Sequence, residues 1–174
     1  MEFEPLALQG AFLIHLEPKC DARGSFTRLF DAELFARREL ATEYPQHNLS
    51  RNPAKGTLRG LHYQRSPHAE IKLVRCIRGR IYDVIVDVRE SSATYLQHVG
   101  VELRADTPAM LYVPEGFAHG FLTLEPDSEV HYLVSHPYTP SAEGGLRWDD
   151  PKLHIQWPER VEVVSERDMA HNLL

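Results

Sequence analysis

Leu58-Arg59-Gly60-Leu61-His62-Tyr63-Gln64, followed at a short distance by Lys72-Leu73-Val74-Arg75, is the stretch that decides how this chain folds. Its apolar residues are spaced as in buried β-strands. An arginine, a histidine and a lysine are interleaved with them. Burying such groups is unfavourable unless a ligand or a partner satisfies them. The stretch therefore predicts strands that carry a functional site.

The same β-like pattern continues downstream. Breaks rich in Gly, Pro, Ser and Asp separate short apolar runs, which is typical of strands joined by turns. We expect strands at residues 57–64, 71–78, 80–89, 96–103, 110–113, 119–124 and 129–135. Many short strands at regular intervals predict an all-β sandwich or barrel.

The flanking segments have different patterns. Residues 6–30 predict short strands broken by a turn at Asp21-Ala22-Arg23-Gly24, where the glycine can adopt a positive φ. Asp31 to Leu40 predicts a short helix with Asp31 as its N-cap. The segment from Tyr138 to Leu174 is loop-rich, with a helical turn around Ser165 to Ala170.

Strand alternation indicates which side chains share a face, because alternate residues point the same way. It groups His62 with Leu58, Gly60 and Gln64, Lys72 with Val74 and Cys76, and Tyr132 with Val130 and Val134. Arg59 has the opposite parity to His62. Both can serve one cavity only if the strand bulges near Gly60 or if Arg59 acts at a rim.

Length and composition predict one globular domain. The chain has 174 residues and 43% hydrophobic content, enough to bury a core without disulfides or metals. Cys20 and Cys76 are far apart and form no CxxC motif, so a reducing cytoplasm fits best. The N-terminus lacks the features of a signal peptide and no apolar run is long enough to span a bilayer, so we expect a soluble protein.

The charge pattern points to a small anionic ligand. A net charge of −6 disfavours nucleic acid or an anionic membrane as the main partner, because both require a basic face. Arg23, Arg59, Lys72 and Arg75 nevertheless stand among apolar or small residues. We expect them to form a local cationic pocket on an acidic protein.

Several blocks, in order, resemble the dTDP-4-dehydrorhamnose 3,5-epimerase family, which are nucleotide-sugar epimerases of the cupin superfamily. The blocks are LRGLHYQ, KLVRC, GRIYDVIVDVR, PEGFAHGF and YTPSAEGGLRWDDP, with WP beyond them. The resemblance implies a single epimerase domain over residues 1–174, a jelly roll (double-stranded β-helix) with short peripheral helices. The jelly-roll core would cover about 45–140, with the N-terminal strands and the C-terminal segment packed on it. It also implies a cytoplasmic homodimer without metal or cofactor, in deoxysugar biosynthesis.

The resemblance also implies a catalytic set. Epimerisation next to a ketone requires a base, a group that stabilises the enolate and an acid on the opposite face. Carried over by position, His62 is the base, Tyr132 the proton donor, Asp168 the carboxylate that orients His62, and Lys72 the cation at the 4-keto oxygen. The residues that the resemblance places in contact with the sugar, diphosphate and nucleoside are Arg23, Phe26, Gln46, Asn48, Arg59, Lys72, His119, Tyr138, Glu143 and Arg167. Of these, Tyr138 would stack on the base, and Arg23 would reach into the neighbouring subunit.

The chain departs from this family at three positions. Arg28 stands where glutamate is usual, Pro137 replaces an aromatic residue, and Glu70 replaces a common glutamine before Lys72. These departures leave the nucleotide base, the sugar and the number of inverted carbons open.

Each proposed site residue has a structural alternative. Ser165-Glu166-Arg167-Asp168 fits a capping box, in which Asp168 closes a helix start. Tyr132 could be a core tyrosine with a satisfied hydroxyl, and Lys72 a strand-end lysine with its stem on apolar surface. In the same way His62 could be a satisfied structural residue, His119 could bond Asp83 beneath the pocket, and Arg23 could be a solvated turn residue.

Rival functions also remain. A metal-dependent cupin fits the β-rich pattern, but such sites need a His-x-His cluster with a glutamate, and the strand here offers His62 alone. A non-catalytic nucleotide-sugar binding module keeps a pocket without its chemistry. Within the enzyme class, a single-centre epimerase or a ketoisomerase of a related deoxysugar is the nearest alternative.

Overall fold

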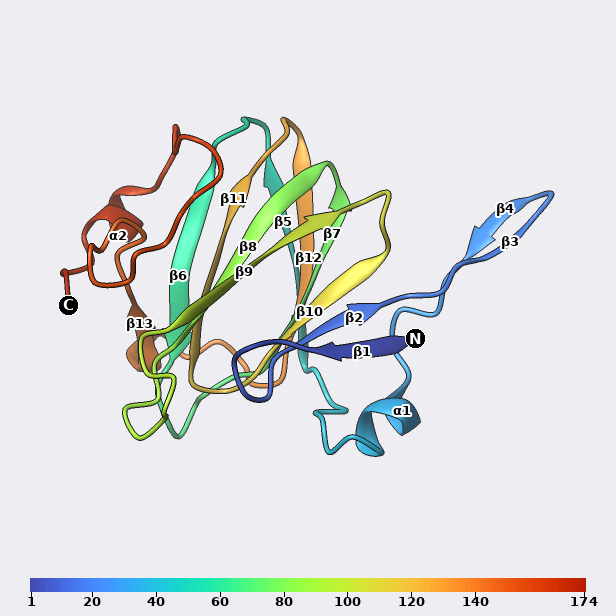
Figure 1. The fold of residues 1–174 in the computed structure, drawn as a ribbon, viewed down its shortest axis with the longest axis horizontal. Coiled ribbons are helices and arrows are strands. Elements are labelled where there is room, and N and C mark those ends of the chain that lie inside the picture. Colours follow the sequence, from blue (N-terminus) through green and yellow to red (C-terminus); the bar gives the residue numbers. More distant parts are fainter.

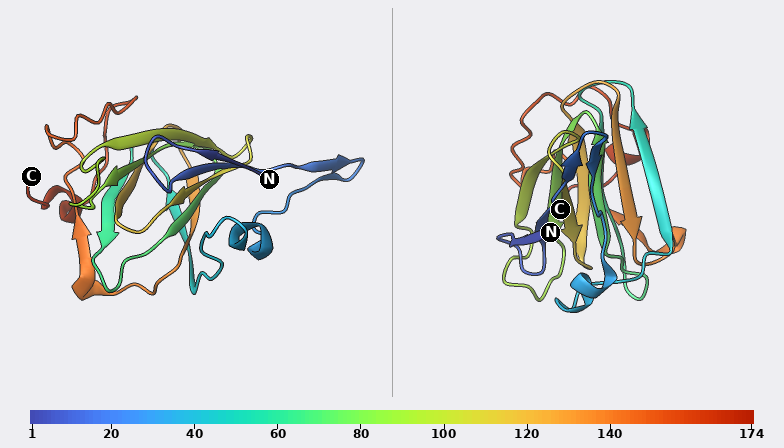
Figure 2. Two further views of the ribbon diagram at one scale, coloured as in Figure 1. Left: turned by 60° about the horizontal axis from the view of Figure 1, so that its bottom comes forward. Right: turned by 90° about the vertical axis from the view of Figure 1, so that its right-hand side faces the viewer.

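The computed structural model describes residues 1–174 and consists mainly of two antiparallel sheets that face each other (Figures 1 and 2). The six-stranded sheet has the order β1 (Glu2–Pro5), β2 (Phe12–His15), β10 (Ala109–Val113), β7 (Lys72–Arg78), β12 (Ser128–Val134) and β5 (Gln46–Asn52). The five-stranded sheet has the order β13 (Glu143–Gly145), β6 (Leu58–Gln64), β11 (Phe117–Thr123), β8 (Arg80–Asp87) and β9 (His98–Arg104). This architecture is the predicted all-β, cupin-like jelly roll.

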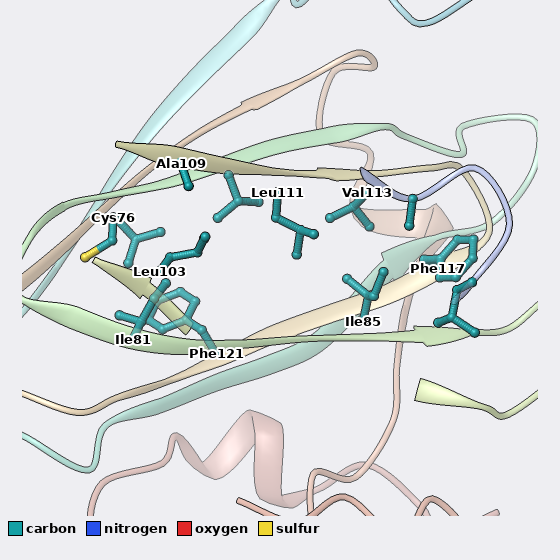
Figure 3. Close-up of a cluster of buried hydrophobic side chains, with 13 residues drawn as sticks. Cys76, Ile81, Ile85, Leu103, Ala109, Leu111, Val113, Phe117 and Phe121 are labelled. Carbon is teal, nitrogen blue, oxygen red and sulfur yellow. The ribbon is translucent and has the colours of Figure 1, made fainter. Parts of the chain in front are cut away.

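The main hydrophobic core lies between the sheets (Figure 3). Leu111 of β10 and Ile85 of β8 are fully buried there, and Phe121 of β11 is 4% exposed. Each large side chain that leaves water in this way contributes roughly 1.5–3 kcal/mol to folding. The core fills the interior near β8, β9 and β10, so the cleft described below lies on the β5 and β6 side.

A second cluster covers the outer face of the six-stranded sheet. Phe35 of helix α1 (Ala32–Ala36) is fully buried against Tyr112 and Leu133 of that sheet. Asp31 caps the helix as predicted, but the helix ends at Ala36 rather than at Leu40. The chain reverses at Glu39, whose φ is 58°, and Leu40 donates its N–H back to the Phe35 carbonyl. The reversal lets Leu40 pack on the cluster.

A two-stranded hairpin projects from the body of the molecule (Figure 1). It consists of β3 (Lys19–Asp21) and β4 (Gly24–Phe26). Gly24 has a φ of 123° at the turn between them, which confirms the predicted turn.

Most strands were predicted, including the short strands expected within residues 6–30, which are present as β2, β3 and β4. All seven strands predicted between residues 57 and 135 are present, within a few residues of the predicted bounds. Strands β1, β5 and β13 were not predicted. The C-terminal segment contains the 3-10 helix η1 (Pro140–Ala142) and helix α2 (Glu166–Met169), the latter where a helical turn was expected.

Strand β6 contains the bulge that the sequence left open. His119 of β11 pairs with His62, whereas Phe121 pairs with Arg59, so β6 has one extra residue between these pairs. Gly60 lies in this bulge with a φ of 114°, and a Cβ there would lie 2.6 Å from the Gly120 Cα. The predicted grouping of Leu58 with His62 is therefore wrong. Leu58 packs in a separate cluster on the other face, and Arg59 shares the cleft with His62.

None of the helices has the length and apolar content needed to span a bilayer.

Candidate active site

A long cleft opens between the two sheets. It consists of two adjoining cavities of about 690 and 680 Å³, which share His62, Lys72, Tyr132 and Arg167 along their walls. Both sheets contribute, since His62 lies on β6 whereas Lys72 and Tyr132 lie on β7 and β12. Residues from four separate parts of the sequence therefore meet in one place.

His62 and Asp168 form a hydrogen-bonded pair on one wall. His62 Nε2 lies 2.8 Å from Asp168 Oδ1, and Asp168 Oδ2 accepts the Gly60 N–H at 3.1 Å. The carboxyl group is nearly buried, with 5% of its side chain exposed, whereas the imidazole is 32% exposed to the cleft. Burial by itself raises the pKa of Asp168, but the hydrogen bonds and charge of His62 and the Gly60 N–H outweigh it and lower that pKa. The pair is thus an ionised carboxylate that orients an accessible imidazole.

Asp168 also takes part in the helix start, through different atoms. Ser165 is the N-cap of α2, and its Oγ accepts the Asp168 backbone N–H at 3.1 Å. The carboxylate is left free to bond His62 and Gly60. Ser165 therefore caps the helix, whereas the Asp168 carboxylate does not close it as the capping box predicted but bonds His62 and Gly60. Figure 1 shows α2 beside β6, the arrangement that brings the two residues together.

Lys72 is a buried cation beside the dyad. Its side chain is 8% exposed, and its Nζ donates to the His62 backbone carbonyl at 3.1 Å. Glu70 Oε1 lies 3.2 Å from the same nitrogen. Lys72 is thus the first residue of its strand, as the structural alternative has it, and its ammonium lies in the cleft.

Tyr132 is the tyrosine that lines both cavities of the cleft. Its ring packs at the edge of the main core and lines both cavities. Burial, reinforced by the nearby negative charge of Glu70 and opposed by Arg59, raises the pKa of Tyr132. The phenol is therefore protonated at neutral pH and can donate a proton.

Two further predicted residues line the first cavity. His119 Nε2 bonds the fully buried Asp83 at 2.8 Å, as the structural alternative predicted, and the ring also faces the cavity. Arg59 Nε donates to Asn52 Oδ1 at 2.7 Å. Asn52 in turn donates to the Ser128 carbonyl, so the guanidinium is held by a buried amide.

The second cavity contains a polar cluster. Tyr138 donates its hydroxyl to Glu143 at 2.7 Å, and Glu143 forms an ion pair with Arg167. Gln46 accepts the Tyr138 N–H at 2.8 Å. Asn48 lines the same cavity from β5. Tyr138 is 52% exposed, so its ring is free to stack on a flat ligand.

Three predicted residues lie outside the cleft of this chain. Arg23 is on the projecting hairpin and pairs with Asp21, and Phe26 on the same hairpin is 68% exposed. Arg75 alternates with Lys72 and Val74 on β7, so it faces the outer side of the sheet near His131. The expectation that four cations gather is therefore wrong. Arg51, Arg59, Lys72 and Arg167 are the arginine and lysine residues that line the first cavity.

Three residues that shape the site were not predicted to have a role in it. Asn52 holds Arg59, while Gln64 and Glu70 form hydrogen bonds beside Lys72. The parity of Gln64 with His62 was a usable signal, since it places Gln64 on the cleft side of β6. Asn52 left no signal, because its strand was not predicted.

The donor groups do not fit a metal-dependent cupin. On β6 the neighbours of His62 at two positions either side are Gly60 and Gln64, so no His-x-His pair exists. His62, Asp168 and His171 have potential ligand atoms within 4.8 Å of one another. In that group, however, His62 and Asp168 satisfy each other at 2.8 Å, and the second carboxylate oxygen is bonded to Gly60.

Several similar proteins are named as 3,5-epimerases. The chain is 43% identical over 171 residues to a dTDP-4-dehydrorhamnose 3,5-epimerase of Sinorhizobium fredii, covering 98% of this chain and 88% of the relative. A crystal structure of the Bacillus anthracis 3,5-epimerase with TDP and PPi bound matches with a TM-score of 0.96 at 37% identity, covering 99% of each chain. A Legionella pneumophila 3,5-epimerase in complex with dTDP-4-keto-L-rhamnose matches with a TM-score of 0.92 at 35% identity, covering 99% of this chain and 92% of that one.

Single-centre enzymes are also similar. A dTDP-4-dehydrorhamnose 3-epimerase of Streptomyces niveus is 35% identical, covering 100% of this chain and 84% of the relative. A solved 3'-monoepimerase of Streptomyces bikiniensis, in complex with dTDP, has a TM-score of 0.89 at 32% identity, covering 97% and 85%. That structure is a double mutant whose replaced histidine and tyrosine lie 70 positions apart, the same separation as His62 and Tyr132.

A family model described as dTDP-4-dehydrorhamnose 3,5-epimerase matches residues 5–174, which is nearly the whole chain. Its match agrees with the names of the relatives and with the fold. The chain belongs to the dTDP-4-dehydrorhamnose 3,5-epimerase family.

Proposed function

We propose that this protein inverts carbons 3 and 5 of dTDP-4-dehydro-6-deoxy-D-glucose, giving dTDP-4-dehydro-L-rhamnose. The observation that carries the proposal is the meeting of the His62–Asp168 pair, the protonated Tyr132 and the buried Lys72 in one cleft. Family membership agrees with it.

The chemistry follows from the ketone in the substrate. A C–H bond next to a carbonyl is acidified, so His62 Nδ1, the ring nitrogen that is not bonded to Asp168, can remove that proton while the C–H electrons form the enolate. Asp168 stabilises the imidazolium that results. Lys72 stabilises the negative charge on the former carbonyl oxygen.

Tyr132 then returns a proton to the opposite face of the carbon. One proton leaves and one is gained, so the step is an isomerisation that needs no oxidant or reductant. The phenolate recovers its proton from solvent, and His62 loses the one that it took. Repeating the sequence at the other carbon next to the ketone inverts the second centre.

Binding of the nucleotide part is assigned to the second cavity. Its polar cluster of Tyr138, Glu143 and Arg167 offers a flat ring, a carboxylate acceptor and a guanidinium. Arg59 is suited to the diphosphate because its guanidinium donates parallel hydrogen bonds. The sugar then lies over His62 where the two cavities join.

The projecting hairpin supports a homodimer as the active form. Arg23 and Phe26 are exposed at a distance from the cleft of their own chain, and Phe26 is a large apolar side chain left in water. We assign them to the cleft of a second copy, where Arg23 adds a cation for the diphosphate. Two free cysteines suit the cytoplasm as the compartment.

A single-centre 3-epimerase is the second candidate, because two similar proteins carry that activity in their names. The two enzymes use the same proton transfers and differ in whether carbon 5 reaches the base. The same residues therefore support either outcome.

Incubation with dTDP-4-dehydro-6-deoxy-D-glucose in heavy water tests the proposal. NMR should show deuterium at carbons 3 and 5 of an inverted product. Deuterium at carbon 3 alone would assign the single-centre activity, and tight binding without any deuterium would assign a binding module.

A further inference from the structure

Glu70 lies just before β7 with its carboxylate in the cleft. Its side chain is 10% exposed and lines the second cavity. One carboxylate oxygen lies 3.2 Å from Lys72 Nζ, and the other accepts the Gln64 amide N–H at 3.0 Å. A buried carboxylate is tolerated when both oxygens have partners in this way.

These contacts close a ring between two strands. Lys72 Nζ donates to the His62 carbonyl, and Gln64 follows His62 by two residues on β6. Glu70 joins the Gln64 side chain to the Lys72 side chain, so the ring runs from His62 through Gln64, Glu70 and Lys72 back to His62. Thr139 holds the Gln64 amide in place by donating its N–H to Gln64 Oε1 at 2.6 Å.

The ring determines where the lysine can donate. An ammonium group has three N–H bonds, and here two are directed to the His62 carbonyl and to Glu70. Tetrahedral geometry leaves one direction for the third. We infer that Glu70 is a positioning residue that, with the His62 carbonyl, presents the third N–H of Lys72 to the substrate's carbonyl oxygen. The inference rests on the proposed function and names a residue of that same site.

The charge of Glu70 has a separate effect on the phenol. It adds to burial in raising the pKa of Tyr132, whereas Arg59 acts in the opposite direction. The charged or titratable groups that share the cavities with Tyr132 are Arg59, His62 and Tyr63 of β6, His119 of β11, Arg51 and His47 of β5, Glu70, Lys72, Tyr138, Glu143, Arg167 and Asp168. Replacing Glu70 by glutamine removes one negative charge from this set and keeps a hydrogen-bond acceptor.

Geometry and charge can therefore be separated with two variants. Glu70→Ala removes the anchor and the charge, whereas Glu70→Gln removes the charge and the acceptor for Gln64 but keeps one amide oxygen that can accept from Lys72. Glu125→Gln is the matched control, because Glu125 also pairs with a cation, Arg80, but lies outside both cavities. Each variant is assayed for kcat, KM, thermal unfolding and the pH dependence of kcat. The tyrosine ζ-carbons of each variant are also titrated by NMR, and Tyr132→Phe identifies the Tyr132 resonance.

The inference predicts that Glu70→Ala lowers kcat at least about tenfold with little change in KM, because Lys72 acts on charge that develops during the reaction. Glu70→Gln should restore most of kcat at neutral pH. In that variant the Tyr132 resonance should titrate at lower pH, and the alkaline limb of kcat should move the same way.

Three results would overturn the inference. The first is wild-type kcat at every pH in Glu70→Ala. The second is a Glu70→Gln variant as slow as Glu70→Ala with an unmoved Tyr132 titration. The third, a wild-type enzyme that produces no deuterium exchange, would overturn the proposed function together with it. If Glu70→Ala does not fold, Glu70→Gln is measured alone. Its kcat at each pH and its Tyr132 titration are then compared with those of the wild type, and no change in either would overturn the inference.

Discussion

Asp168 shows how one residue can meet two demands at the scale of single atoms. Its backbone N–H is capped by Ser165, and its two carboxylate oxygens bond His62 and Gly60. A sequence pattern that indicates a capping box does not state which of these atoms is used. The Ser165 cap and the contact with His62 coexist because they use different atoms of Asp168.

Asp168→Asn should lower kcat by roughly 10²- to 10⁴-fold while the free energy of unfolding changes by about 1 kcal/mol or less. The amide cannot stabilise an imidazolium as a carboxylate does, whereas the Ser165 cap is retained. Steady-state kinetics and denaturant unfolding of the same samples measure the two effects. Ser165→Ala is the control, since loss of the cap should cost about 1 kcal/mol and leave kcat nearly intact. A large loss of stability with unchanged kcat per folded molecule would assign Asp168 to structure alone.

At the scale of elements, the bulge in β6 places Arg59 and His62 on one face. Gly60→Ala should destabilise the protein by about 2–5 kcal/mol, because the φ of 114° is strained for alanine and its Cβ would meet the Gly120 Cα at 2.6 Å and the His119 carbonyl at 2.7 Å. Urea unfolding measures this. The exposed Gly24, with nothing within 4 Å of a built Cβ, is the comparison. A Gly60→Ala loss no larger than that of Gly24→Ala would refute the packing argument.

The turn after β8 depends on a buried anion. Asp87 is fully buried and accepts hydrogen bonds from Arg89, Ser92 and Thr94. Burial acts to raise the pKa of Asp87, but these donors outweigh it and lower that pKa well below the ordinary 3.8. The stabilisation is therefore complete above pH 3.8 and is lost as the pH falls through the lower folded-state value.

Asp87→Ala should cost about 3–5 kcal/mol at neutral pH, because it leaves the Arg89 charge without its partner. The difference between this variant and the wild type in the free energy of unfolding should shrink below pH 3.8. Unfolding curves recorded across acid pH measure this difference. Asp106→Ala, which removes an exposed partner of Arg104, should cost about 0–1 kcal/mol. Equal losses for the two variants would contradict the role of burial.

These elements also show what the sequence could predict. Short apolar runs between turn residues marked β6 to β12, and strands such as β10 and β11 are buried along their whole length. Strand β5 was missed because its residues, such as His47 and Arg51 on one face and Asn48 on the other, line a cleft or face solvent and leave no apolar period. The outward direction of Arg75 could have been predicted, because alternation places it opposite Lys72 and Val74. The bulge depends on pairing with the neighbouring strand, which no local pattern records.

At the scale of the whole molecule, the hairpin is the feature that one chain does not explain. If Arg23 serves the cleft of a second copy, then mixing Arg23→Ala and His62→Ala proteins should restore activity. A mixed dimer has one cleft in which His62 and the partner's Arg23 are both intact. After subunit exchange, activity should rise to about a quarter of wild type for a random mixture of dimers. No rise above the separate variants, with exchange verified, would place Arg23 outside the neighbouring site.

The most direct test of the central claim, that His62 and Tyr132 act on opposite faces of the substrate, is a deuterium measurement on Tyr132→Phe and His62→Ala in heavy water. With the base intact and the donor absent, Tyr132→Phe should return deuterium from the His62 side, so NMR should show deuterium in the substrate without inversion. His62→Ala should show exchange at least about a hundredfold slower at both carbons. Inversion by Tyr132→Phe at the wild-type rate, or exchange by His62→Ala at that rate, would contradict the account.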